Sequence, residues 1–291
     1  MLNYNGHEDT IECVDSIFNK SDIKDYQVII VDNGSTDGSV EKIKAWVENN
    51  NINANKLFIL ENGSNEGYAR GNNLGIRFAL QNFSNEYILI LNNDTILENG
   101  FIQPLLEVFK NEKVALASPK IIDPNKNVHW QAFLLKRLNL LTYVIFYSPL
   151  RQIFINTPIS VEYIISKRND PLKVYSIQGC SMLFKAKVLE EIGLFDEATF
   201  LGWEECIIAE KLLRHGYETY VVPKSKIFHK DSMTHPKVFT SSERRKIYYE
   251  SETYYQKNYL KLPEYQLWLI NVIRRALNCA GTMYNSVRPI K

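Results

Sequence analysis

The sequence lacks an excess of charge of either sign, because 34 lysines and arginines nearly balance 33 aspartates and glutamates. A protein that holds nucleic acid by bulk charge needs a basic surplus, so that class is excluded, and selectivity has to come from a defined site. Four cysteines are scattered without a CxxC pair: Cys13, Cys180, Cys206 and Cys279. This pattern favours reduced thiols in a cytoplasmic protein over a disulfide framework or a zinc site.

Long hydrophobic runs and targeting segments are missing as well. No uninterrupted apolar run reaches the roughly 18 residues of a membrane-spanning helix, and no signal peptide is visible at the start. We therefore expect a protein that is made and kept in the cytoplasm. A chain of 291 residues with 45% hydrophobic content can bury a large core. It is expected to form one large domain with an appendage.

Two nucleotide-binding signatures are also absent. A dinucleotide fold needs a GxGxxG turn after its first strand, and residues 2–10, LNYNGHEDT, do not contain one. This absence argues against an NAD-dependent dehydrogenase. The P-loop pattern is missing too, so an ATPase has no support in the sequence.

What the sequence does contain is an alternation of strand-like and helix-like segments through the first 120 residues. The strand-like runs are residues 26–32, 56–62, 87–94 and 114–122, and the helix-like runs between them are 38–50, 67–83 and 100–111. This order predicts a parallel sheet wound with helices. Residues 1–18 predict a turn and an amphipathic helix with almost no strand before them. Either the first strand is a stub, or the reading frame starts inside a strand that a longer form would complete.

Polar residues follow each apolar run of the predicted sheet. They lie at residues 3–5, 31–39, 61–73 and 92–94. Because ligands bind at the carboxyl ends of strands in open α/β sheets, these ends are expected to converge on one polar crevice. The run Tyr87–Leu91 stops at Asn92, Asn93 and Asp94, which makes Asp94 a candidate ligand contact. The alternative is a turn that caps the next helix.

Seven segments, in this order, resemble the inverting family 2 glycosyltransferases of the GT-A fold, especially bacterial rhamnosyltransferase-like and polysaccharide-assembly members. They are residues 2–6 (LNYNG), 31–39 (VDNGSTDGS), 65–73 (NEGYARGNN), 89–94 (LILNND), 178–197 (QGCSMLFKAKVLEEIGLFDE), 203–217 (WEECIIAEKLLRHGY) and 221–229 (VVPKSKIFH). The resemblance covers roughly residues 1–230.

The resemblance implies an α/β fold of the nucleotide-diphospho-sugar transferase type, with a mostly parallel central sheet flanked by helices. Residues 1–230 would form the GT-A domain, with a nucleotide-sugar-binding half at 1–120 and an acceptor half at 121–230. The acceptor half contains an apolar insertion at 129–170. Residues 231–291 would form a C-terminal helical extension.

The activity implied is transfer of a sugar, with inversion, from a UDP- or dTDP-sugar to a saccharide acceptor. Bacterial enzymes of this kind commonly use acceptors linked to polyprenyl diphosphate, in capsule, O-antigen or exopolysaccharide assembly. Two other functions stay open. One is a sugar nucleotidyltransferase, and the other is a catalytically inactive sugar-binding relative, which Asn92 and Glu205 suggest because both depart from the family pattern.

For the donor, the resemblance implies that Asp32 hydrogen-bonds the base, that Tyr4 stacks on it, and that Arg70 lies near a phosphate. The remaining donor contacts would be Asn3, Asn33, Asn73, Asn93 and Asp94. Asp32 could instead begin an Asx-turn, and Arg70 could belong to a solvated helix face. Asp37 is expected to be a helix N-cap.

A divalent metal site is implied where the family's fourth strand ends, often in Asp-x-Asp. Here the motif reads Asn92-Asn93-Asp94, so Asp94 would hold Mg²⁺ or Mn²⁺, and His229 would complete the metal or diphosphate site. Mg²⁺ commonly binds through one or two carboxylates plus substrate phosphates, so one Asp can suffice. Asn at the first position departs from the family pattern and puts the strength of the metal site in doubt. His229 could alternatively be structural.

Inverting transfer is a single displacement and needs a general base on the acceptor side. The family's usual Glu-Asp pair reads Glu204-Glu205 here, which implies that Glu205 is the base, with an arm one methylene longer. The alternative is that both acids complement the helix dipole. The acceptor side would include Gly179, Cys180 and Trp203, the last of which could be a sugar platform or a core residue.

Two apolar segments with interspersed basic residues suggest contact with a membrane surface. They are residues 129–170 and the C-terminal stretch 265–284, which contains the pair Arg274 and Arg275. Such segments could instead pack in the core or form the interface of a homo-oligomer. If they contact a membrane, we expect the protein at the inner face of the plasma membrane.

Overall fold

The computed structural model describes residues 1–129, 133–137, 160–230 and 239–287, with only the backbone for residues 133, 162 and 276–287. Most of the predicted insertion at 129–170 therefore lies outside the described residues. The same holds for residues 231–238 and 288–291 of the predicted C-terminal extension.

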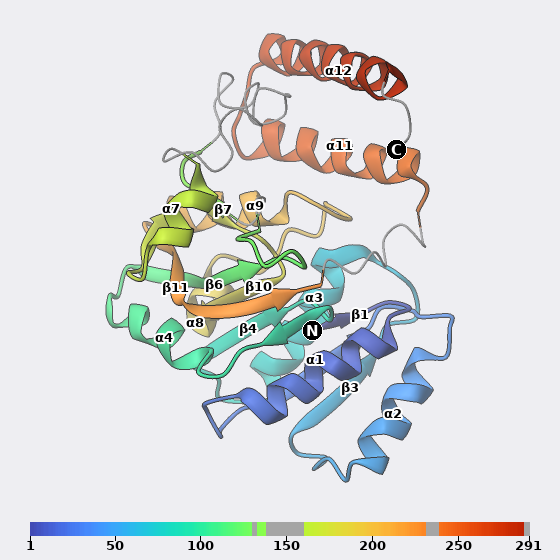
Figure 1. Ribbon diagram of the computed structural model, residues 1–291, viewed down its shortest axis with the longest axis vertical. Coiled ribbons are helices and arrows are strands. Elements are labelled where there is room, and N and C mark those ends of the chain that lie inside the picture. The colour runs from blue at the N-terminus through green and yellow to red at the C-terminus, as the bar shows by residue number, and fades with distance from the viewer. Residues whose placement is uncertain (130–132, 138–159, 231–238, 288–291) are drawn as a thin grey trace.

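The first half of the chain alternates strands and helices as its sequence predicts (Figure 1). Its elements are β1 (Leu2–Asn3), α1 (His7–Lys20), β2 (Val28–Asp32), α2 (Ser39–Asn49), β3 (Leu57–Glu61), α3 (Gly67–Asn82) and β4 (Tyr87–Leu91). Strands β1, β2 and β3 are parallel, and a parallel bridge from Leu2 to Asn92 joins β1 to the residue after β4. Each strand therefore ends at the same edge, where the loops that follow β1 to β4 meet.

The second half of the chain builds a mixed sheet. Its elements are β5 (Thr95–Leu97), α4 (Ile102–Glu107), the 3₁₀ turn η1 (Val108–Lys110), β6 (Val114–Ile122), β7 (Phe133–Leu134), α7 (Val161–Lys167), β8 (Leu172–Val174), β9 (Ser176–Ile177), β10 (Ser181–Lys185), α8 (Ala186–Glu191), α9 (Glu204–Arg214) and β11 (Glu218–His229). The strand order is β4-β10-β6-β11-β5. Strand β11 is parallel to β6, whereas β10 is antiparallel to both of its neighbours.

The predicted α/β class is confirmed, and antiparallel pairing is more frequent in the second half than expected. Parallel neighbours need a crossover connection, usually a helix. The only α-helix between β4 and β6 is α4, which has six residues. The alternation of strands and long helices that predicted a parallel sheet therefore ends after β4. Strand β10 lies between β4 and β6 although it comes from a distant part of the chain.

Apolar residues on both faces of this sheet form the core. In β6, Val114 to Pro119 are all buried, which matches a central strand covered by helices on both sides. The cysteines whose side chains are described, Cys13, Cys180 and Cys206, are buried free thiols. This agrees with the expectation of reduced cysteines.

Two helices, α11 (Ser241–Asn258) and α12 (Glu264–Val287), form a hairpin at one end of the molecule, next to α9 (Figure 1). A capping box begins α11: the Thr240 hydroxyl accepts from the Glu243 backbone N–H, and the Glu243 carboxylate accepts from that of Thr240. The predicted C-terminal helical extension is therefore confirmed. Among the helices that the structure describes, none combines the length and the hydropathy needed to cross a membrane.

Candidate active site

The polar residues that follow the first strands lie together, as the parallel order requires. The backbone N–H of Asn33 donates to the carbonyl of Asn3 at 2.8 Å, and the N–H of Asn62 donates to the carbonyl of Asp32 at 2.8 Å. The bridge between Leu2 and Asn92 brings in the end of β4. The predicted convergence of strand ends is confirmed.

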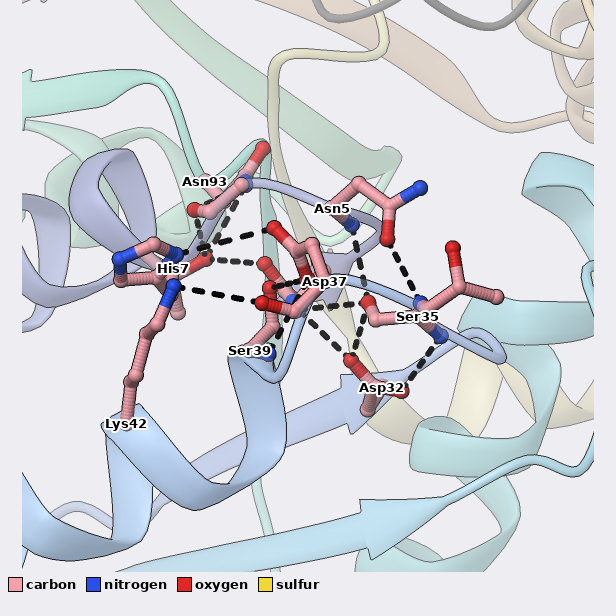
Figure 2. Close-up of polar contacts among 12 residues, drawn as sticks. Asn5, His7, Asp32, Ser35, Asp37, Ser39, Lys42 and Asn93 are labelled. Carbon is pink, nitrogen blue, oxygen red and sulfur yellow. Dashed lines mark hydrogen bonds and ion pairs between the residues drawn. The ribbon is translucent and has the colours of Figure 1, made fainter.

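Asp32 is held in one orientation by its neighbours, as Figure 2 shows. One carboxylate oxygen accepts Nδ2 of Asn3 at 2.7 Å and the Ser35 hydroxyl at 2.6 Å, and the other accepts the Ser35 backbone N–H at 2.9 Å. The residue is only 3% exposed. These contacts form the Asx-turn that the sequence allowed. Because a carboxylate offers about four lone-pair sites, one further donor can still bind.

Asn3 orients Asp32 from inside the protein. Its side chain is fully buried, and its amide oxygen accepts the Thr10 hydroxyl of α1 at 2.7 Å. Tyr4, the next residue, is half-buried. Asn5 follows in the left-handed conformation with φ 51°, and its side chain accepts the Thr36 backbone N–H at 2.8 Å. The loop after β1 is thereby tied to the loop after β2.

Asp37 lies one residue before the N-cap of α2, the position that it was expected to occupy. The N-cap of α2 is Gly38, which has φ 74°, a conformation that glycine adopts without strain. The Asp37 carboxylate reaches past it and accepts the backbone N–H of Ser39 at 3.0 Å and its hydroxyl at 2.5 Å. Burial acts to raise the pKa of Asp37, but these bonds outweigh it and the pKa is lowered. The N-cap prediction was wrong in position, although Asp37 still satisfies a helix N–H.

The residues after β4 have three separate roles. The Asn92 backbone N–H donates to the carbonyl of Cys180 at 3.0 Å, and Nδ2 of Asn93 donates to the Thr10 hydroxyl at 3.0 Å. Asp94 is buried, and its Oδ1 lies 3.1 Å from Nε2 of His229. This pair forms because β5 runs antiparallel to the end of β11, which places Thr95 opposite His229.

The Asp94–His229 pair fits a divalent cation as two of its ligands. Mg²⁺ holds ligands at about 2.0–2.1 Å in octahedral geometry, so two adjacent ligands lie about 3 Å apart. The separation of Oδ1 and Nε2 is close to that value. No group of three or more His, Cys, Asp or Glu side chains in the described ranges could hold a metal on its own. A metal here would need oxygen ligands from a substrate, as diphosphates provide.

Glu204 and Glu205 begin α9 after a sharp change of chain direction. Gly202 has φ 84°, and Trp203, the N-cap, has φ 68°. Oε1 of Glu205 accepts the backbone N–H of Gly179 at 3.0 Å, whereas Oε2 of Glu204 is buried and has no hydrogen-bond partner among the described residues. The two neighbouring acids are therefore in different environments.

These environments raise the pKa of both acids. Burial, followed by the charge of Glu205, raises the pKa of Glu204 well above its usual range. Burial also raises the pKa of Glu205, while the hydrogen bond from Gly179 acts in the opposite direction. A hydrogen-bonded carboxylate of raised pKa is a stronger base than an exposed one. Glu205 accepts a hydrogen bond and has a raised pKa, whereas burial of Glu204 favours its neutral form.

Tyr68 belongs to this site, although the sequence analysis did not select it. Its hydroxyl donates to the carbonyl of Gly179 at 2.6 Å, on the same residue whose N–H binds Glu205. Burial, and then the charges of Glu204 and Glu205, raise the pKa of Tyr68 well above its usual range, so it remains a donor. Its position in the first turn of α3, directly after Gly67, was the available signal.

The residues predicted for the donor and those predicted for the acceptor are connected through residues 178–180. The carbonyl of Cys180 accepts from Asn92, two residues before Asp94, and the N–H of Gly179 donates to Glu205. The Cys180 side chain is fully buried and points away from solvent. This short run of backbone links the residues predicted for the metal to the residue predicted as the base.

Three other predicted residues lie in structural contacts. Asn33 is 1% exposed, and its amide bonds Asn62 and Asn65 of the loop after β3. Asn73 is also 1% exposed and binds the backbone of Phe195 and the carboxylate of Glu197. Arg70 is exposed, and its Nε donates to the carbonyl of Glu197 at 3.4 Å. The Asn33 contacts join two loops of the site, and those of Asn73 and Arg70 join α3 to the segment before α9.

Trp203 contacts the C-terminal hairpin. Its ring stacks on Tyr255 of α11 with centroids 5.4 Å apart and 23° between the planes. The side chain is half-buried, so part of it remains accessible. Trp203 is therefore packed on one side, and its role as a sugar platform stays a prediction.

A model of the family described as Glycosyl transferase family 2 matches residues 1–193. Among curated relatives, the low-salt glycan biosynthesis hexosyltransferase Agl10 of Haloferax volcanii is 23% identical over 210 residues, which is 70% of this chain and 57% of the relative. The dTDP-rhamnosyl transferase RfbF of Shigella flexneri is 24% identical over 202 residues, covering 69% and 59% of the two chains. The chain thus spans less than two thirds of the length of these relatives.

Solved glycosyltransferases share the fold. The mannosyltransferase PcManGT from Pyrobaculum calidifontis, solved with GDP-Man and Mn²⁺, has a TM-score of 0.56 at 17% identity and covers 99% of this chain and 74% of its own. GalNAc-T7, solved with UDP, GalNAc and Mn²⁺, has a TM-score of 0.59 at 16% identity, with coverages of 79% and 42%. The predicted GT-A fold is therefore confirmed.

Proposed function

The chain belongs to glycosyl transferase family 2, and on that basis we propose that it transfers a sugar from a nucleoside diphosphate sugar to a saccharide acceptor, with inversion at the anomeric carbon. One observation carries the proposal. The buried Asp94–His229 pair and the hydrogen-bonded Glu205 are joined through residues 178–180, where Asn92 contacts Cys180 and Glu205 contacts Gly179. A pair able to hold a cation for the leaving diphosphate and a base, on either side of one backbone segment, suit a displacement reaction.

The donor would lie across the ends of β1 to β4. The oriented Asp32 carboxylate would accept an N–H of the base, and half-buried Tyr4 would stack on the ring. The diphosphate would face Asp94 and His229. A Mg²⁺ or Mn²⁺ held by these two residues would neutralise charge on the departing nucleoside diphosphate. Asn3, Asn33, Asn73 and Asn93 support this surface through the contacts described above, and Arg70 borders it.

On the acceptor side, Glu205 would take the proton of the attacking hydroxyl. That oxygen forms a bond to the anomeric carbon while the bond from this carbon to the diphosphate breaks, and the electron pair leaves with the nucleoside diphosphate. The raised pKa of Glu205 and its bond to Gly179 favour this role, because they make an oriented base of suitable strength. Tyr68 would keep Gly179 in place.

The names of two relatives narrow the choice of donor and acceptor for this proposal. RfbF is named as a dTDP-rhamnosyl transferase, and a relative from Mycobacterium tuberculosis, 23% identical over 212 residues, is named as an N-acetylglucosaminyl-diphospho-decaprenol L-rhamnosyltransferase. We therefore favour a UDP- or dTDP-linked sugar and an acceptor carried on a polyprenyl diphosphate, in assembly of a cell-envelope polysaccharide. An acceptor of this kind would place the protein at the inner face of the plasma membrane.

The experiment is a substrate panel in which the released phosphate species is identified. Purified protein would be incubated with Mn²⁺, nucleotide sugars of several bases and short-chain lipid-diphosphate saccharides. Acceptor-dependent release of nucleoside diphosphate, together with a lengthened saccharide, is the expected result. A parallel incubation contains a sugar phosphate and a nucleoside triphosphate, and pyrophosphate release there would assign a nucleotidyltransferase instead. Binding without turnover across the panel would assign a sugar-binding relative.

A further inference from the structure

The hairpin of α11 and α12 contains a groove of about 600 Å³ that the proposed reaction does not use. Four cationic side chains line it, Arg245 and Lys246 from α11 and Arg274 and Arg275 from α12, with Glu250 as a carboxylate among them. The residues that line the groove belong to α11 and α12, and α12 is the outermost element of the fold (Figure 1).

Arg274 is built into the floor of this groove. Its side chain is only 10% exposed, it donates to the buried Glu252 carboxylate at 2.7 Å, and its guanidinium lies 4.3 Å from the ring centroid of Tyr249. Its Nε is buried and has no acceptor among the described residues. The guanidinium is thus held in place as part of the groove lining, and its hydrogen-bonding capacity is not fully used by the protein.

The other three cations are available at the rim. Arg245, Lys246 and Arg275 are exposed, and Lys246 stands 3.9 Å from Glu250 in an open pair that contributes little. The charge of Glu252 offsets that of Arg274, and the charge of Glu250 offsets that of Lys246. The charges of Arg245 and Arg275 are not offset in this way, so the groove is positively charged. Its chemistry therefore favours an anion with several oxygens, and arginine matches phosphate well.

Next to the groove, α12 presents an apolar stripe to solvent. Tyr265 is 68% exposed, Trp268 is 66% exposed and Val272 is 42% exposed. A spacing of three and four residues places them on one face of the helix. Tyrosine and tryptophan side chains favour the headgroup level of a bilayer, where an apolar ring and a polar atom are both satisfied.

We propose that this groove binds the phosphate-bearing headgroup of an anionic membrane lipid while Tyr265, Trp268 and Val272 enter the bilayer interface. The inference deepens the proposed function and rests on its placement of the protein at a membrane. A lipid surface suits the groove better than a second copy of the chain. Two copies joined symmetrically here would bring the same positive charges together, whereas anionic lipid complements them.

The test is flotation with vesicles of phosphatidylcholine alone and of phosphatidylcholine mixed with phosphatidylglycerol. A groove variant, Arg245→Gln with Lys246→Gln and Arg275→Gln, is compared with a control that removes three exposed lysines elsewhere, Lys113→Gln with Lys187→Gln and Lys224→Gln. The parent should bind the anionic vesicles. Each cation near a membrane surface contributes about a fivefold change in binding, so the groove variant should bind about 10²-fold more weakly. The control variant should bind about as tightly as the parent. Trp268→Ser should weaken binding to both kinds of vesicle.

Other outcomes would overturn the proposal. Equal losses in the groove and control variants would mean that only bulk charge acts. Failure of the parent to bind either vesicle, with a dimer in gel filtration that the groove variant breaks, would make this face an interface between copies. Release of nucleoside diphosphate to a water-soluble acceptor is measured in parallel. It should be unchanged in the groove variant, so a failed membrane inference can be told apart from a failed assignment of the reaction.

Discussion

At the residue scale, two adjacent glutamates differ in what surrounds them. Glu205 is oriented by the Gly179 N–H, whereas Glu204 is buried and its Oε2 lacks a partner among the described residues. A base needs a carboxylate that is ionised and aimed, whereas burial stabilises an acid in its neutral form. The different surroundings of the two carboxylates therefore separate the roles that two identical residues can take.

The first prediction assigns the base to Glu205. Glu205→Gln keeps the size and can keep the contact with Gly179, but it cannot accept the proton from the acceptor. Turnover should fall by about the 10²–10⁴-fold that a positioned base contributes, with donor affinity nearly unchanged. Steady-state rates and donor calorimetry measure the two effects. Glu205→Asp restores the family's usual residue and should retain activity if reach is not critical.

A reversed pattern would contradict this assignment. If Glu205→Gln turned over at close to the parent rate while Glu204→Gln was inactive, the base would be Glu204. The pH dependence gives a second check. Because the pKa of Glu205 is raised, kcat/KM should begin to fall at a pH above the usual glutamate value of about 4.3 as acid is added.

The second prediction concerns stability and Glu204. A folded-state pKa raised above the unfolded value means that the native protein binds the proton more tightly. Stability is then greatest below the unfolded pKa and falls as pH rises through the window up to the raised pKa. The glutamine of Glu204→Gln does not titrate. The unfolding free energy of this variant minus that of the parent should therefore increase steadily from pH 4 to neutral pH. Urea unfolding at several pH values measures the difference, and Glu190→Gln on the exposed face of α8 is the control. A constant difference at all pH values would show that Glu204 does not ionise on unfolding in this way.

At the element scale, the start of α3 and the loop before α9 hold each other. The backbone N–H of Tyr68 donates to the carbonyl of Phe200 at 2.8 Å, and the Tyr68 hydroxyl reaches Gly179. Asn73 and Arg77, further along α3, bind Glu197 in the segment that leads to α9. Helix α3 therefore positions both the backbone donor of Glu205 and the approach to α9.

The third prediction tests this junction with two glycines. Gly67 has φ 86°, and a Cβ there would lie 2.3 Å from the carbonyl oxygen of Phe200, so the loop would have to move. Gly67→Ala should cost about 1–3 kcal/mol of stability or more and should lower turnover, because the displaced loop leads into α9, where Glu205 lies. Gly63→Ala is the matched control, since no atom lies within 4 Å of its added Cβ. Similar unfolding curves and rates for the two variants would show that the junction does not depend on this close approach.

At the scale of the whole molecule, the Asp94–His229 pair joins the two halves of the chain. Asp94 follows β4, and His229 ends β11, 135 residues later. A nucleoside diphosphate bound at this pair would therefore stabilise both halves together. Ligand that binds only the folded state adds about 2.7 kcal/mol at a concentration of about 100 times Kd.

The fourth prediction follows from this linkage. A nucleoside diphosphate with Mn²⁺ should raise Tm by several degrees in a single transition, and a chelator should remove most of the shift. Asp94→Asn should behave like the chelated parent, because the diphosphate would then face a pair without a carboxylate charge for the metal. Asp123→Asn, the same substitution in a turn after β6, should keep the full shift. If neither the chelator nor Asp94→Asn reduces the shift, the metal does not take part in donor binding.

The amino-acid sequence by itself determined the local features of this protein. Apolar runs alternating with amphipathic segments specify the strands and helices of the first half, because both patterns arise from neighbouring residues. Polar residues placed directly after buried strands specify the edge where the strand ends converge, and this located Asp32 and Asp94, whereas Glu204 and Glu205 at the start of α9 were identified only by the resemblance. The resemblance to the family depended on the same short segments in their order.

The tertiary structure determined the contacts between residues that are far apart in the sequence. Strand β10 lies antiparallel between β4 and β6, which the βαβ pattern did not predict, and this places Gly179 beside Glu205 and Cys180 beside Asn92. The site role of Tyr68 and the binding of Asn73 to the segment before α9 follow from the same packing. No local pattern encodes such contacts, because sheet register and helix docking are set by burial of the whole core rather than by adjacent residues.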